Sequence, residues 1–199
     1  MKFAAGLMLV ASAMFAGAGT AQQGAVAPVA AVSAIAIPMT MTLPGFADGS
    51  TIPTKYTCVA GAAVVSPEVR WSNVPAGTQS FVLVFHDLEP RPMKGVMDNS
   101  HWVLWNIPAT STGLPEGVAA GAALPDGTHQ MKRPRTIPGS VYSYYGPCAP
   151  KGPNHHYVFE LYALDSTLNL PEDATRAEIV KASDGHVLAA AGWFGMFHQ

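Results

Sequence analysis

Proline and glycine recur so often in this chain that they exclude a fold built from long helices. The 199 residues include 17 Pro and 19 Gly, which divide the chain between positions 44 and 153 into short pieces. Hydrophobic residues make up 49% of the chain and charged residues 12%, so the chain can form a sizeable core. The formal net charge of -2 supplies no positive field for a polyanion, and we expect no nucleic-acid partner.

The N-terminal segment differs in composition from the rest, because Lys2 is the only charged residue among the first 47. An apolar, Ala-rich run at 3–16 and small residues up to Ala21 are typical of a secretory signal with a small-x-small cleavage site. An uncleaved anchor is less favoured, because the apolar part is shorter than the roughly 20 residues of a spanning helix. We therefore expect residues 1–21 to be a signal peptide of a periplasmic or secreted protein, with no stable membrane insertion after cleavage. Uncharged residues 22–38 are expected to form a low-complexity tether.

From residue 39 to residue 199 the pattern predicts one β-dominated domain. Apolar residues alternate with Thr at 39–43, which indicates a half-buried strand that ends before a Pro-Gly turn. Further runs of strand length, rich in aromatic and branched residues, lie at 80–85, 101–107 and 157–164. The first of these is almost continuously apolar and is expected to be covered on both faces. A late helix is expected from the Pro-Glu-Asp run at 171–173 to about Lys181.

Polar side chains gather where the expected strands begin or end, and there a rigid sheet can hold them at a solvent-facing rim. The segment His-Asp-Leu-Glu at 86–89 follows one strand, His101 opens the next, and His-His-Tyr at 155–157 opens another. Each is a weak signal alone, since His at a strand start is commonly a surface or satisfied core residue. Three at neighbouring strand ends favour one site.

Four segments of this domain carry a resemblance to a known family. They are HDLEP at 86–90, HWVLWNIPA at 101–109, YYGPCAPKGPNHHYVFELYALD at 144–165 and GHVLAAAGWFG at 185–195. Together they resemble the phosphatidylethanolamine-binding family, also called Raf-kinase-inhibitor-like proteins, in its bacterial branch, over about Met39 to Phe197. The resemblance implies a mainly β fold in which a central antiparallel sheet packs on a smaller sheet, with the short helix near the C-terminus. It also implies a small pocket at one end that accepts phosphate-like anions.

The resemblance assigns the ligand-binding positions residue by residue. They are Asp87, Glu89, His101, His155 and Tyr157, with Gly146 and Pro147 as a wall. The chain departs from the family pattern in three places. The segment at 87–91 reads Asp-Leu-Glu-Pro-Arg instead of Asp-Pro-Asp-Ala-Pro, Asn99 replaces a common aromatic residue, and Phe197 replaces a common Tyr. We expect these differences to affect which ligand head group is bound more than they affect the fold.

The chemistry of these residues agrees with an anion site. Two imidazoles and a phenol offer directional donors, and a nearby carboxylate favours the imidazolium form, so binding should tighten at mildly acidic pH. Asp87 would itself repel a phosphate, and its expected task is to orient a His or to meet an ammonium group. Trp102 should point to the opposite face from His101, because successive strand residues alternate. Candidate rim cations, equally readable as ordinary solvated charges, are Arg91, Lys94 and Arg133.

The predicted function is therefore an exported binding protein for a phosphate-like anion or a phosphorylated or phospholipid head group, without turnover. The alternative is a hydrolase or isomerase that uses Asp87 with His101 or His155 as acid and base. Against it, the sequence has no Gly-x-Ser-x-Gly elbow and no Cys placed beside a base. No cofactor and no metal are expected, although Asp87, His101 and His155 match the residue types of an iron-binding facial triad, because no His-x-Asp or His-Glu-x-x-His unit is present.

Cys58 and Cys148 are the only cysteines. In an exported chain with no third Cys, a single disulfide is favoured over two free thiols. The alternative of two buried thiols stays open, because both cysteines also occur in members of the resembled family that look cytoplasmic.

Overall fold

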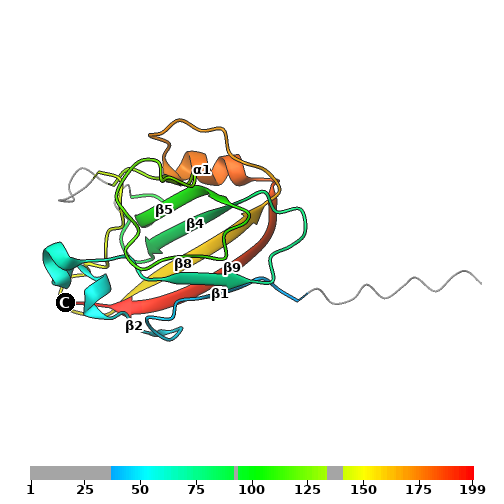
Figure 1. Cartoon of the computed structure of the whole chain (residues 1–199). Coiled ribbons are helices and arrows are strands. Elements are labelled where there is room, and N and C mark those ends of the chain that lie inside the picture. Colours follow the sequence, from blue (N-terminus) through cyan, green and yellow to red (C-terminus); the bar gives the residue numbers. More distant parts are fainter. Residues whose placement is uncertain (1–36, 92–93, 134–140) are drawn as a thin grey trace, which may run out of the picture. The chain divides into compact units, whose positions relative to one another are not determined.

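The computed structural model describes residues 37–91, 94–133 and 141–199 (Figure 1). The expected signal peptide at 1–21 and nearly all of the expected tether at 22–38 lie outside the described residues.

A six-stranded sheet, called here the large sheet, forms the centre of the domain, with strand order β2-β9-β8-β4-β5-β7 (Figure 1). Its strands are β2 (Ser50–Thr51), β9 (Val187–Phe197), β8 (His155–Leu164), β4 (Ser80–Asp87), β5 (Asn99–Pro108) and β7 (His129–Gln130). All neighbours are antiparallel except β2, which runs parallel to β9. Every residue of β4 is buried, as its continuous apolar sequence predicted.

A three-stranded small sheet covers one face of the large sheet. It consists of β1 (Thr40–Thr42), β3 (Val69–Ser72) and β6 (Gly113–Leu114) in the order β1-β3-β6. Met41 and Trp71 of the small sheet bury their side chains in one cluster with Phe81, Leu83 and Phe85 of β4. Two short 3-10 helices, η1 (Thr54–Tyr56) and η2 (Cys58–Ala63), follow β2. The expected fold class, a central antiparallel sheet packed on a smaller one, is confirmed.

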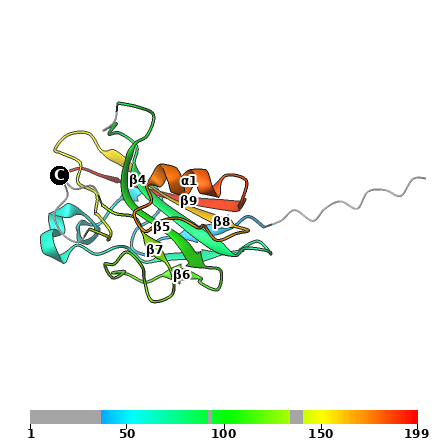
Figure 2. The ribbon, with the colours of Figure 1, turned by 90° about the horizontal axis from the view of Figure 1, so that it is seen from above.

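The other face of the large sheet is covered by α1 (Arg176–Ser183) (Figures 1 and 2). Ile179 of α1 packs with Val82 and Val84 of β4 in a second apolar cluster. The helix begins later than the run at 171–173 suggested, because Thr175 and Glu178 form a capping box that satisfies its first N–H groups. None of the helices within the described residues is long and apolar enough to cross a membrane.

The sequence did not predict β9, although it is the longest strand with 11 residues. Three Ala and two Gly lower the strand propensity of its sequence, so the pairing with β8 decides its conformation. Gly195 allows β2 to lie close to β9, since a Cβ there would be 2.5 Å from Ile52 Cγ1 and 2.8 Å from Phe46 Cε2. The absence of a side chain at this position therefore serves packing.

Candidate functional site

A cavity of about 310 Å³, the small cavity, lies where β4 ends and where β5 and β8 begin. It is lined by Asp87, Pro90, Asn99, His101, Tyr145, Cys148, Ala149, Pro150, His155 and Tyr157. Four of the expected ligand residues, Asp87, His101, His155 and Tyr157, therefore line one cavity, contributed by three adjacent strands.

A β-bulge turns His101 into this cavity. The ladder between β4 and β5 pairs Phe85 with Trp102 and His86 with Ser100, which leaves His101 as the extra residue. His101 and Trp102 consequently lie on the same face, in contact with the same aromatic cluster. The His101 ring is 5.4 Å from that of Phe85, and the Trp102 ring is 5.5 Å from that of Tyr144, which stacks on Phe85. The expectation that Trp102 points away from His101 is wrong, because strict alternation does not hold across a bulge.

The Asp87 carboxylate orients His155. Asp87 Oδ2 lies 2.8 Å from His155 Nδ1, and the other oxygen accepts a hydrogen bond from the Glu89 backbone N–H at 3.1 Å. Burial raises the pKa of Asp87 even though the hydrogen bond from His155 works against the shift. Because Nδ1 of His155 is engaged by Asp87, its Nε2 is the nitrogen left for a ligand.

The Tyr157 hydroxyl ties the β8 strand to the loop that walls the cavity. It accepts a hydrogen bond from the Ala149 backbone N–H at 3.1 Å. Burial, followed by the neighbouring Asp87 carboxylate, raises the pKa of Tyr157 far above its ordinary value. The phenol therefore stays protonated and can donate its hydrogen to Asp87 or to a bound anion.

His101 faces the cavity as a hydrogen-bond acceptor. Its Nδ1 lies 2.9 Å from the Tyr145 carbonyl oxygen, which can only accept, so the ring proton is assigned to Nδ1. Its Nε2 lies 3.2 Å from the Asn99 amide nitrogen, which donates to the free lone pair. Burial lowers the pKa of His101 to about 4, so the ring is neutral at neutral pH. This differs from the expected imidazolium donor, because Asp87 engages His155 instead of His101.

Three residues expected to bind the ligand, Glu89, Gly146 and Pro147, are not among the residues that line the small cavity. Glu89 Oε1 lies 2.7 Å from His156 Nδ1, and Oε2 accepts from the His156 backbone N–H at 2.7 Å. Gly146 lines a different cavity, where a Cβ would lie 2.5 Å from the Tyr56 carbonyl oxygen. The Pro147 carbonyl accepts from the Cys58 backbone N–H at 3.0 Å. Among the described residues, the wall of the small cavity comes from the next three positions, 148–150.

Within the described part of the chain, the three residues that lie close enough to ligate one metal ion differ from the trio Asp87, His101 and His155 that the sequence suggested. Atoms of Asp87, Glu89 and His155 that can ligate a metal lie within 4.8 Å of one another, whereas His101 is not part of this group. In this structure the carboxylate oxygens and His155 Nδ1 hydrogen-bond to neighbouring protein groups. The expectation that no metal is required stays a prediction.

The expected disulfide between Cys58 and Cys148 is present, with 90 positions of sequence separation. It joins η2 to the loop at 148–150 and so braces one wall of the small cavity. Sequence reasoning missed a second polar cluster, around His86 on the opposite face of β4. There His86 Nδ1 lies 2.6 Å from Asp98 Oδ2, its Nε2 lies 3.1 Å from Glu160 Oε2, and Arg176 of α1 pairs with Asp98.

Comparisons with known proteins agree with this architecture. The family model described as phosphatidylethanolamine-binding protein matches residues 42–198. A UPF0098 protein of Methanothermobacter thermautotrophicus is 37% identical over 161 residues, covering 81% of this chain and 99% of the relative. YbhB of Escherichia coli, another UPF0098 protein, is 38% identical over 135 residues, covering 67% and 81%.

Solved structures show the same fold. The crystal structure of a putative phosphatidylethanolamine-binding protein homologue from Chlamydia trachomatis has a TM-score of 0.68 at 29% identity, covering 81% of this chain and 98% of that one. The crystal structure of Escherichia coli YbcL, with a TM-score of 0.68 at 23% identity, covers 82% and 99% and supports the fold alone.

Proposed function

Because the chain belongs to the phosphatidylethanolamine-binding protein family, we propose that its small cavity binds a phosphate-like anion or phosphorylated head group without turnover. The observation that carries this proposal is the convergence of Asp87, His101, His155 and Tyr157 on one cavity of about 310 Å³. That volume lies at the lower end of the range of about 300–1,000 Å³ that cavities for whole drug-sized ligands span, so it suits one head group.

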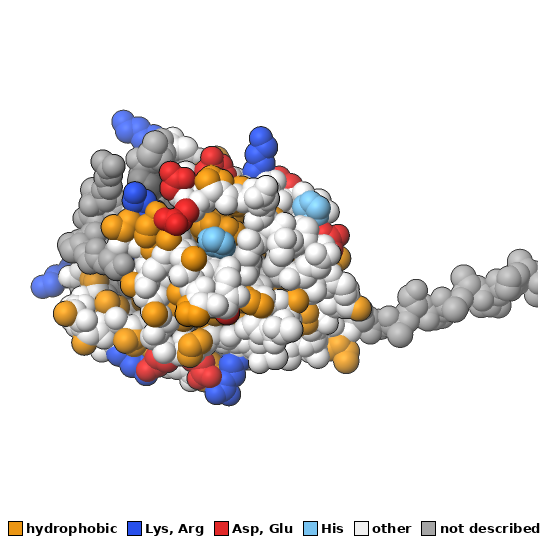
Figure 3. Space-filling view, turned by 45° about the horizontal axis from the view of Figure 1, so that its top comes forward, with side chains coloured by type: hydrophobic (Ala, Val, Ile, Leu, Met, Phe, Trp, Pro, Cys, Tyr) orange, Lys and Arg blue, Asp and Glu red, His pale blue; other side chains and the backbone are white. Residues whose placement is uncertain are grey.

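Short-range hydrogen bonds supply the affinity in this proposal. On the face shown in Figure 3, acidic and basic side chains are mixed around apolar ones, so charge of one sign does not concentrate there. Donors that can turn to the ligand are the Tyr157 hydroxyl and the Asn99 amide. His155 Nε2 is a further donor when the ring is an imidazolium whose other N–H is bonded to Asp87. His101 Nε2, whose single lone pair is released when the Asn99 amide turns to the ligand, supplies one acceptor, which matches a P–OH group. The cavity therefore favours a phosphate that still carries a proton.

Calorimetric titration with inorganic phosphate and phosphoethanolamine tests the proposal. Replacing His155 by Ala removes one hydrogen bond to a charged group, so we expect the dissociation constant to rise by about 10- to 150-fold, or about 1.5–3 kcal/mol. His186→Ala is the matched control, because His186 pairs with Asp165 at the surface and does not line the small cavity. Equal affinities of wild type and His155→Ala at both pH 6 and pH 8 would refute the assignment of the site.

The alternative of a hydrolase or isomerase has one observation in its favour, the Asp87–His155 pair at 2.8 Å, which has the composition of an acid–base couple. Among the described lining residues, the sulfur of Cys148 is held in a disulfide and is not a nucleophile. Release of inorganic phosphate from phosphoethanolamine, abolished in an Asp87→Asn variant, would replace the binding proposal by the enzymatic one.

We also propose that the protein works in the periplasm or outside the cell. The expected signal sequence and the disulfide support this location, because disulfides persist in oxidising compartments. Fractionation of cells that express the full chain should recover a protein shortened by about 21 residues outside the cytoplasm. Full-length protein in the cytoplasm would contradict export.

A further inference from the structure

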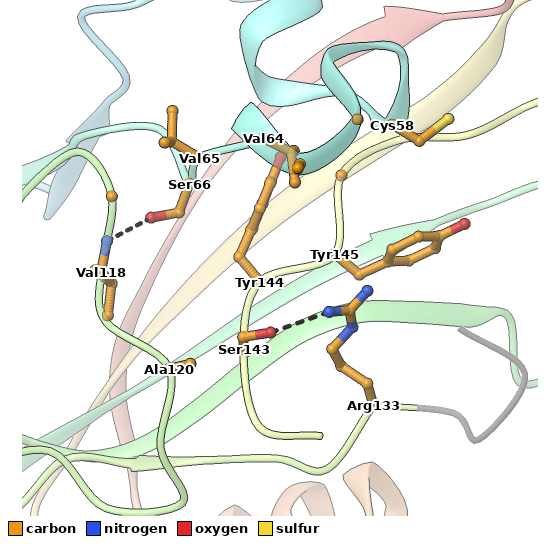
Figure 4. Close-up of a pocket in the computed structure, with 14 residues that line it drawn as sticks. Cys58, Val64, Val65, Ser66, Val118, Ala120, Arg133, Ser143, Tyr144 and Tyr145 are labelled. Carbon is orange, nitrogen blue, oxygen red and sulfur yellow. Dashed lines mark hydrogen bonds between the residues drawn. The ribbon is translucent and has the colours of Figure 1, made fainter. Parts of the chain in front are cut away.

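Figure 4 shows a second cavity, the large cavity, with a volume of about 770 Å³. It shares the lining residue Tyr145 with the small cavity. Its walls come from η2 and the residues after it, from the loop at 117–120 and from the segment at 143–146. Its volume is within the range of sites that enclose small organic molecules. Nothing in the proposed function uses it so far.

The large cavity has an apolar side and a polar side. Figure 4 shows Val65, Val118 and Ala120 on one side and Arg133 with Tyr145 on the other. Arg133 donates a hydrogen bond to the Ser143 hydroxyl at 3.1 Å, which fixes the guanidinium at the polar side. A ligand that fits this lining is apolar at one end and polar or anionic at the other.

The polar side borders the small cavity. Tyr145 lines both cavities, and its ring stacks on the His101 ring with centroids 4.8 Å apart. The Arg133 guanidinium lies 5.2 Å from the centroid of the same Tyr145 ring. The disulfide also joins them, because Cys58 lines the large cavity and Cys148 the small one. The two cavities are thus neighbours, with the polar end of the large one towards the phosphate site.

We propose that the large cavity holds the apolar substituent of the ligand whose phosphate occupies the small cavity. The ligand class is then a phosphate ester with an apolar chain or ring, which crosses Tyr145 between the two cavities. This inference rests on the proposed function, because it takes the small cavity as the phosphate site. Valine and alanine side chains would cover the apolar substituent, and Arg133, at the polar side of the large cavity, would meet the phosphate end.

An alkyl phosphate series tests this inference. We would titrate inorganic phosphate, methyl, butyl and octyl phosphate, below their aggregation limits, into the wild-type protein. Each methylene that enters an apolar cavity should tighten binding by up to about fourfold. Octyl phosphate should therefore bind at least 100-fold more tightly than methyl phosphate.

Variants that fill the large cavity locate the effect. Val118→Trp should make the series flat while the affinity for inorganic phosphate stays at the wild-type value, which also verifies that the variant is folded. Ala120→Trp is the second variant if Val118→Trp does not fold. Val180→Trp is the control of equal size change, since Val180 is an exposed residue of α1, and it should keep the wild-type series.

The outcomes separate the two proposals. Binding of inorganic phosphate with a flat wild-type series would overturn the inference and leave the proposed function standing, whereas no binding by any phosphate would overturn the proposed function. Octanol that binds as tightly as octyl phosphate would mean that the large cavity serves a separate ligand. Binding to phosphatidic acid vesicles without binding of soluble octyl phosphate would point to a membrane surface, and would also overturn the inference.

Discussion

The tautomer of His101 predicts how phosphate binding depends on pH. His101 Nδ1 donates to the Tyr145 carbonyl at 2.9 Å, so a ligand that replaces the Asn99 amide meets the lone pair of Nε2. Because the pKa of His101 is about 4, protonation of its ring at pH 7 is unfavourable by about 3 pKa units. That amounts to about 4 kcal/mol. A hydrogen bond to a charged group returns only about 1.5–3 kcal/mol, so His101 remains neutral when the ligand is bound.

The proton between His101 and the ligand must then come from the phosphate itself. A phosphate monoester loses its second proton with a pKa of about 6, so the monoanion falls from about one half of the ligand at pH 6 to about 1% at pH 8. We expect the apparent affinity to fall by about 50-fold over this interval. The sequence predicted the same direction for another reason, a rising imidazolium population, and the two explanations differ in which molecule titrates.

Titration calorimetry with methyl phosphate at pH 6, 7 and 8 measures this dependence. Dimethyl phosphate is the control ligand, because it carries no titratable proton in this range, and any change in its affinity belongs to protein groups. Sulfate, a dianion throughout, should bind at least 10-fold more weakly than phosphate at pH 6. Methyl phosphate affinity that follows the dimethyl phosphate profile, or sulfate affinity equal to that of phosphate, would refute the assignment of His101 as an acceptor.

Three further predictions concern the stability of the fold. Replacing Cys58 and Cys148 by Ser should lower the free energy of unfolding by about 4.5 kcal/mol, as expected for a loop of about 90 residues; an unchanged urea midpoint would contradict it. Asp98→Asn should destabilise by about 3 kcal/mol. The hydrogen bonds to Asp98 lower its pKa despite burial, so the wild type should lose this contribution as the pH falls below about 4, and a wild-type advantage that persists at pH 2 would count against it. Gly195→Ala should lower the melting temperature, whereas Gly192→Ala, whose Cβ would meet its nearest atom at 3.7 Å, should not; equal shifts would contradict the packing argument.

The parts of the fold that the sequence predicted are those in which local composition decides the structure. The apolar run of β4 requires cover on both faces, and the structure supplies it with the small sheet and α1. In contrast, β9 contains three Ala and two Gly and is extended because β8 pairs along nearly its whole length. Nothing in the sequence of β9 alone indicates that β8 is its pairing partner.

The same distinction applies to the candidate site. Polar residues at strand ends predicted one site, and the family resemblance assigned Asp87, His101, His155 and Tyr157 to it. These four residues line one cavity because strands β4, β5 and β8 are neighbours. The hydrogen-bonding role of His101 depends on two features that arise only between segments. One is the bulge opposite Phe85, and the other is the Tyr145 carbonyl contributed by a loop 44 positions away.

These two features also explain why the small cavity would discriminate between forms of the same anion. Without the bulge, alternation would direct His101 towards the α1 face, and the cavity would lose its acceptor. Without the Tyr145 carbonyl, no acceptor would hold the ring proton on Nδ1, and Nε2 could carry the proton and donate to a dianion. Because the backbone fixes the tautomer, the selectivity proposed for the small cavity depends on the segment at 143–146 as much as on the residues that contact the ligand. That segment also lines the large cavity, so an apolar substituent placed there would contact the loop that sets the protonation of the phosphate it carries.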